Sequence, residues 1–232
     1  MRHSILSAKN KAQFPLRRLI IDKAKTATRP DYAGAVAYAL DRLRTELPPE
    51  LLYHNTMHTE GDVLPAAVRL ARLSNVAEPD LHLLEVAAAF HDLGQIRAIL
   101  GHEQIGAEIM SGVLPRYGFS QNEIERVFGM ILATRLPQTP LNEEQALLAD
   151  ADLDSLGRED FFATSKALWQ ERTACGMIIA WQTWLENQHR FLTDHHYFTP
   201  AARTLRDEGK RKNIALLERL IRGETVREIS FD

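Results

Sequence analysis

Apolar side chains recur at steps of three or four residues along most of the chain, and this pattern predicts an all-α protein. A clear series is Val36, Leu40, Leu43 and Leu47, just before Pro48-Pro49. Side chains at this spacing share one face of a helix, and proline cannot continue the helical hydrogen-bond ladder. We therefore predict a helix from about residue 31 that ends before residue 48, and we find no segment patterned as a strand.

Residues with helix-capping chemistry mark where further helices begin. Pro79 and Asp80 suit the first turn of a central helix, because proline has no N–H to leave unpaired and aspartate favours the positive end of the helix dipole. Ser120 and Glu123 have the spacing of a capping box, in which the side chain of each residue accepts a hydrogen bond from the backbone N–H of the other. Thr199-Pro200 is a suitable start for the last long helix.

The central helix ends in the adjacent pair His91-Asp92, and both side chains are capable of binding a metal. An apolar stripe that includes Ala88 continues to His91, so the imidazole should point into the core. Alone, such a pair is most often structural, with a hydrogen-bonded core histidine and a helix-terminal aspartate. The interpretation changes because His58 lies upstream and Asp152 lies downstream.

The resulting order of His58, His91-Asp92 and Asp152 resembles the HD-domain superfamily of metal-dependent phosphohydrolases, which carries its ligands in that order on separate helices. Gly94, directly after the pair, and the run Gly101-His102-Glu103 also look like family features. The resemblance extends over about residues 54–157. It implies that His58, His91, Asp92 and Asp152 hold a divalent metal ion.

The same resemblance implies an all-α fold, an HD-domain helical bundle with a C-terminal helical extension. We expect residues 1–30 to form an N-terminal segment in which residues 14–21 could pack on the domain. Residues 31–157 would be the metal-binding helical core. Residues 158–232 would be a helical extension packed on that core.

The last ligand lies in a segment with three nearby aspartates, Asp150, Asp152 and Asp154. Leu148, Asp152 and Leu156 share one helical face, which favours Asp152, and the family pattern favours the same residue. Asp150 remains the alternative. We expect Asp154 to be exposed.

Two imidazoles and two carboxylates leave open positions on an octahedral ion, whereas a closed structural zinc site would favour cysteines. Cys175 is the only cysteine of the chain, so a structural zinc site and an internal disulfide are both disfavoured. We expect one divalent ion, which could be Mn, Fe, Co, Ni or Mg.

Three further residues are candidates for catalysis. His102 and Glu103 could protonate the leaving oxygen or orient the attacking water. Arg135 extends the apolar stripe of Val127 and Ile131 by one turn, on the inward line of that helix. Since a guanidinium repels a second cation and grips phosphoryl oxygens in bidentate fashion, we expect a mononuclear site with Arg135 as a phosphate clamp. Some family members carry a lysine after the His-Asp-x-Gly run, where it could contact phosphate. This chain has Gln95 at that position, so the sequence does not predict a phosphate contact there.

Composition narrows the class of protein. The 232 residues are 45% hydrophobic and 25% charged, which is enough to bury a core, and the formal net charge of −3 argues against a dedicated nucleic-acid binder. The sequence shows neither a membrane-spanning segment nor an N-terminal signal, so we expect a cytoplasmic protein.

We therefore expect a metal-dependent phosphohydrolase whose partner is a small phosphorylated substrate, such as a nucleotide. A catalytically silent nucleotide-binding or sensor module with the same fold is the alternative. The intact set of two histidines and two carboxylates favours the enzyme. The sequence decides neither among phosphomonoesterase, phosphodiesterase and pyrophosphohydrolase activity nor the oligomeric state.

Overall fold

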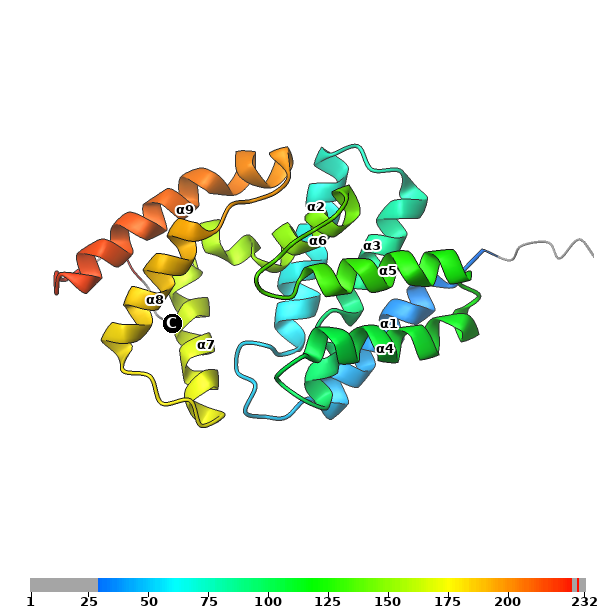
Figure 1. Ribbon diagram of the computed structural model, residues 1–232, viewed down its shortest axis with the longest axis horizontal. Coiled ribbons are helices and arrows are strands. Elements are labelled where there is room, and N and C mark those ends of the chain that lie inside the picture. Colours follow the sequence, from blue (N-terminus) through cyan, green and yellow to red (C-terminus); the bar gives the residue numbers. More distant parts are fainter. Residues whose placement is uncertain (1–28, 227–228, 230–232) are drawn as a thin grey trace, which may run out of the picture.

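The computed structural model describes residues 29–226 and residue 229, and over these residues the chain folds into α-helices joined by loops and short helical turns, with no β-strand (Figure 1). The first group of helices is α1 (Tyr32–Glu46), α2 (Leu64–Leu73), α3 (Glu78–Phe90), α4 (His102–Val113), α5 (Gln121–Ala133) and α6 (Glu143–Asp152). The second group is α7 (Phe161–Ala174), α8 (Trp181–Asp194) and α9 (Pro200–Ile221). The all-α expectation is confirmed. The predicted packing of residues 14–21 falls outside the described residues.

The helix starts that were predicted from capping residues are present. In α5 the Ser120 side chain accepts the Glu123 N–H, and the Glu123 carboxylate accepts the Ser120 N–H, so both halves of the capping box form. Thr199 caps α9 by accepting the N–H of Ala202. Within the described residues, no helix combines the length and apolar character that a membrane span requires.

Helix α3 is the centre of the core. Its residues from Val86 to Phe90 are fully buried, and α1, α2 and α5 surround it. A helix that is apolar on every side is stable only when neighbours cover it all round. The three consecutive alanines of α3 let those neighbours approach closely, and they bring its C-terminal end, with His91, deep into the protein.

Two glycines fix the position of α4 against the end of α3. A Cβ placed on Gly94 would lie 1.9 Å from the carbonyl oxygen of His102, and one on Gly106 would lie 3.0 Å from the carbonyl oxygen of Phe90. The first contact leaves no room for a side chain at Gly94, and the second is tighter than ordinary van der Waals contact. The glycine after the His-Asp pair therefore allows the first turn of α4, which carries His102, to lie directly beside that pair.

A second pair of glycines docks α9 on the other helices. A Cβ on Gly209 would lie 2.0 Å from the carbonyl oxygen of Gly157, so the two backbones touch. Next to this contact, the Asp154 carboxylate accepts hydrogen bonds from Arg69 of α2 and Arg206 of α9. Asp154 is only 3% exposed, and our expectation that it is exposed was wrong. The aspartate is buried because two arginines from separate helices satisfy its charge.

Candidate metal centre

His58 enters the site at the start of a helix. It begins a π-helical turn, His58–Val63, that continues into α2. The Asn55 side chain accepts the N–H groups of Met57 and His58, at 2.8 and 3.2 Å, and so takes up donors that the helix start leaves free. The Tyr53 ring lies 4.7 Å from the His58 ring, between centroids. These contacts hold the imidazole on a rigid element.

His91 and Asp92 enter the site at the end of α3. His91 is 1% exposed, and its Nδ1 donates a hydrogen bond of 2.7 Å to the carbonyl oxygen of Ala88. This bond fixes the tautomer and leaves Nε2 as the nitrogen with a free lone pair, as in many metal-ligating histidines. Asp92 follows in a non-helical conformation that turns its carboxylate towards the same point.

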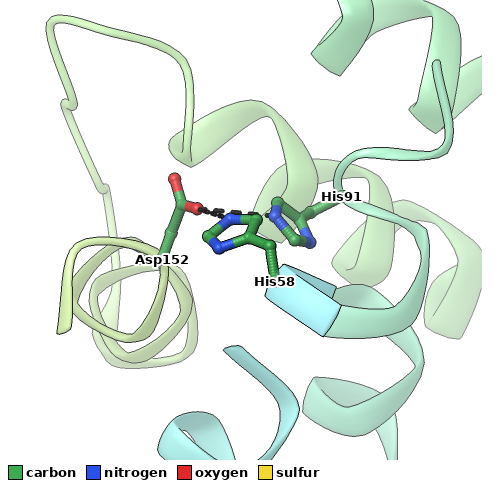
Figure 2. A group of neighbouring side chains, drawn as sticks. All are labelled: His58, His91 and Asp152. Atoms are coloured by element: carbon green, nitrogen blue, oxygen red, sulfur yellow. Dashed lines mark hydrogen bonds and ion pairs between the residues drawn. The ribbon is translucent and has the colours of Figure 1, made fainter. Parts of the chain in front are cut away.

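The candidate ligands converge from three parts of the chain (Figure 2). The Oδ1 atom of Asp152, the last residue of α6, lies 3.3 Å from His58 Nε2 and 3.4 Å from His91 Nε2. On the Asp92 side, Oδ2 lies 3.3 Å from His91 Nε2 and 3.6 Å from His58 Nε2. The ligand atoms of His58, His91 and Asp152 all lie within 4.8 Å of one another.

These side chains fit a divalent cation. His91 Nε2 and Asp92 Oδ2 are buried, yet neither has a hydrogen-bond partner. Buried polar atoms without partners are rare because their desolvation goes uncompensated. Two neutral imidazoles and two carboxylates also carry a formal charge of about −2, which a divalent ion would neutralise.

The titration behaviour of the cluster agrees with a cation position. Burial alone would lower the pKa of His91, but the carboxylates of Asp92 and Asp152 outweigh it and raise this pKa well above its usual value. Burial would raise the pKa of Asp92, but His91 and His102 outweigh it and hold this pKa well below its usual range. Without a metal, these directions favour a proton on the His91 ring and an ionised Asp92 carboxylate. A divalent cation would displace that proton.

Asp150 does not reach the cluster. Its carboxylate accepts the backbone N–H groups of Phe198 and Thr199 and the Thr199 hydroxyl, all at 2.7–2.8 Å. It therefore fixes the turn into α9. Of the two aspartates that the sequence left open, the structure brings Asp152 to the histidines and gives Asp150 a different position.

His102 and Glu103 lie beside the cluster at the start of α4. His102 donates from Nδ1 to the carbonyl oxygen of Ile99 at 2.9 Å, and its Nε2 lies 3.2 Å from Asp92 Oδ1. Burial would lower the pKa of His102, but Asp92 outweighs it and raises this pKa. Glu103 Oε1 lies 3.8 Å from His102 Nε2. His102 thus engages the Asp92 oxygen that faces away from His58 and His91.

A cleft of about 570 Å³ opens at the cluster, between the first six helices and α7 and α8. His102, Glu103 and Arg135 all line it. The expected inward helical position of Arg135 was wrong, because α5 ends at Ala133 and the turn that follows leaves Arg135 exposed at the cleft wall. The backbone leaves the helix here ahead of Pro137, which follows a cis peptide bond.

The structure adds two residues to the site that sequence reasoning did not select, His54 and Glu171. The buried Glu171 carboxylate of α7 accepts the N–H groups of Tyr53 and His54 at 2.8 Å and lies 2.5 Å from His54 Nδ1. His54 lines the cleft, and its ring lies 6.1 Å from that of His102. The signal for His54 was its place four residues before His58. Glu171 lies 117 residues after His54 and belongs to no local motif that could have identified it.

Comparisons with known proteins found a family model and a solved structure that this chain resembles. Residues 62–155 match the family model described as the HD domain. A crystal structure of a "predicted HD superfamily hydrolase" from an uncultured Thermotogales bacterium aligns with a TM-score of 0.55 and 20% sequence identity, covering 84% of this chain and 93% of that chain. No curated protein matches the chain. The resemblance to the HD-domain superfamily and the helical fold that it implied are confirmed.

Proposed function

We propose that this chain, with its HD domain at residues 62–155, is a metal-dependent phosphohydrolase that acts on a nucleotide or another small phosphorylated metabolite. The observation that carries the proposal is the convergence of His58, His91, Asp92 and Asp152 at one end of a cleft, with buried ligand atoms that lack partners. The cleft gives a substrate access to that cluster.

We assign His58, His91, Asp92 and Asp152 as the ligands of one divalent ion, which could be Mn, Fe, Co, Ni or Mg. At this position the ion would lower the pKa of a bound water from about 15.7 towards about 7 and polarise a phosphoryl oxygen. The donor set has nitrogen and oxygen only, which suits an open octahedral site. His102 orients the Asp92 carboxylate through Oδ1, while Oδ2 faces His58 and His91.

His54 is the best-placed donor of a proton to the leaving oxygen. Its Nδ1 is held by Glu171, so Nε2 is the nitrogen available to the cleft. Burial would raise the pKa of Glu171, but His54 outweighs it and lowers this pKa, so the carboxylate stays charged where it holds the His54 ring. His102 is less suited to this role because its Nε2 already faces Asp92 at 3.2 Å. We retain Glu103 as a candidate to orient the attacking water, and His102 as a residue that acts on that water through the Asp92 carboxylate it contacts.

Arg135 is proposed to bind phosphoryl oxygens from the cleft wall. Between His91-Asp92 and Asp152 the chain offers His102 as its one further histidine, and the next helix ends in Ala133-Thr134-Arg135. A guanidinium cannot become a metal ligand, and it repels a second cation. Its bidentate contact to a phosphate supplies the positive charge that a second ion would otherwise bring. The site is therefore proposed to be mononuclear.

Replacing this arginine by lysine should weaken catalysis without removing the metal. For Arg135→Lys we expect kcat/KM to fall by about tenfold or more, since one bidentate charged contact becomes a single one worth about 1.5 kcal/mol less. Metal content by elemental analysis should equal that of the wild type. Arg97→Lys, at a position outside the cleft lining, is the matched control and should leave both quantities unchanged. An Arg135→Lys enzyme with wild-type kinetics would remove Arg135 from the site.

The proposed activity is tested by removing and restoring the metal. We expect turnover of at least one substrate from a panel of phosphomonoesters, cyclic nucleotides and nucleoside diphosphates at neutral pH, measured as release of phosphate or of a nucleotide product. A chelator should abolish the turnover, and added Mn²⁺ should restore it. Nucleotide binding without turnover across the panel and several metals would instead support a catalytically silent sensor module.

A further inference from the structure

The cleft at the metal centre has one ionic end and one apolar wall. The ionic end is the ligand cluster with His54, His102 and Glu103. The opposite wall comes largely from α7 and α8, outside the region that matches the HD domain. Its large apolar side chains are Phe161, Leu168, Trp184 and Phe191, and Thr164, Ser165, Arg172 and Gln188 of the same helices also line the cleft. Sites for small organic ligands combine apolar side chains with a few polar groups in this way, so the wall suits the organic part of a substrate rather than its phosphate.

Leucines on the other side of the cleft are exposed to solvent. Leu100 is 85% exposed and Leu136 is 55% exposed, and both line the cleft across from α7 and α8. A single exposed leucine needs no explanation, but two on the rim of one cleft, facing an apolar wall, form a surface that an apolar ligand would cover.

The position of Leu168 relates the apolar wall to the leaving group. Leu168 lies three residues before Glu171 on α7, so both residues share one helical face. Glu171 holds His54, and we have proposed that His54 donates its proton to the leaving oxygen. The group attached to that oxygen would therefore extend from His54 along Leu168. Phe191 of α8 lines the same cleft.

We propose that α7 and α8 form a leaving-group pocket, and that the substrate is a phosphate ester with a bulky apolar leaving group. This inference rests on the proposed phosphohydrolase function and narrows its substrate class. Leu168 and Phe191 are the specificity-determining residues. Leu100 and Leu136 contact the same leaving group from the rim of the cleft.

Two non-hydrolysable phosphonates test the pocket through binding alone. Benzylphosphonate has the shape of phenyl phosphate, and ethylphosphonate has the shape of methyl phosphate, with equal charge in each pair. With the full chain loaded with Mn²⁺, calorimetry should show that benzylphosphonate binds at least about tenfold more tightly, because only its ring reaches apolar surface.

Three variants locate this preference. In Leu168→Gln and in Phe191→Ala the tenfold advantage of benzylphosphonate should shrink to about threefold or less, while the affinity for ethylphosphonate stays the same. Leu205→Gln, at a partly exposed leucine of α9 outside this cleft, should keep the full advantage. Circular dichroism shows whether each variant is folded, and two independent pocket variants keep the test decisive if one fails to fold.

The outcomes separate this inference from the proposed function. Equal binding of the two phosphonates, no binding of either, or a preference that survives both pocket variants would overturn the pocket. If metal-dependent turnover is still observed in those cases, the phosphohydrolase stands without it. If benzylphosphonate is preferred but no ester is hydrolysed, the pocket stands and the hydrolase does not.

Discussion

The His91→Ala and Asp92→Ala proteins are expected to contain almost no bound divalent metal and to lose at least about 10³-fold in turnover. Each change removes one of four ligands, and an imidazole or carboxylate lost from the cluster also leaves its buried partners uncompensated. Loss of the ion removes transition-state stabilisation of about 4 kcal/mol, which corresponds to that factor. Elemental analysis and steady-state kinetics on the purified proteins measure the two effects.

Matched controls lie on the same helices. His82→Ala changes a histidine of α3 that pairs with Glu85 at the surface, and Asp150→Asn changes an aspartate of α6 that contacts Thr199. Both controls should keep wild-type metal content, whereas Asp152→Asn should lose it. Wild-type metal content in His91→Ala or Asp92→Ala would show that the ligand assignment is wrong.

Removal of the proposed proton donor should give the second large effect. For His54→Gln we expect kcat to fall by about 10²- to 10⁴-fold with metal content unchanged, since general acid catalysis contributes a factor of this size. Glu171→Gln should lower kcat by about 10- to 100-fold, because the imidazole loses the carboxylate that orients it.

The chemistry of the leaving group distinguishes proton donation from a structural role. An ester of 4-nitrophenol needs little protonation of its leaving oxygen, so His54→Gln should slow it much less than an ester of an aliphatic alcohol. The alkaline limb of the pH–rate profile should change in the variant as well, because a general acid acts only while it holds its proton. An equal loss for both kinds of ester, with an unchanged profile, would leave His54 as a merely structural residue.

Local patterns in the sequence predicted the helices well, because periodicity and capping act within one or two turns. The burial of α3 followed from its continuous apolar run, and the capping box of α5 followed from Ser120 and Glu123. His58, His91 and Asp152 were assembled through a family pattern, since no local rule places three distant helices at one point.

The errors came from tertiary contacts and from helix ends. Asp154 is buried because Arg69 and Arg206 meet it from α2 and α9, and neither partner is close in sequence. Arg135 left the expected stripe because α5 ends two residues before it. Glu171 escaped selection for the same reason as Asp154, as its partner His54 lies 117 residues away.

The central claim is that one divalent ion is held by His58, His91, Asp92 and Asp152. Crystals grown with Mn²⁺ and measured on both sides of the manganese absorption edge test it directly, because the anomalous signal identifies and places the metal. We expect a single strong peak per chain, within bonding distance of both Nε2 atoms and of both carboxylates. Two strong peaks about 3.5–4 Å apart, or a peak bound by other residues, would contradict the account.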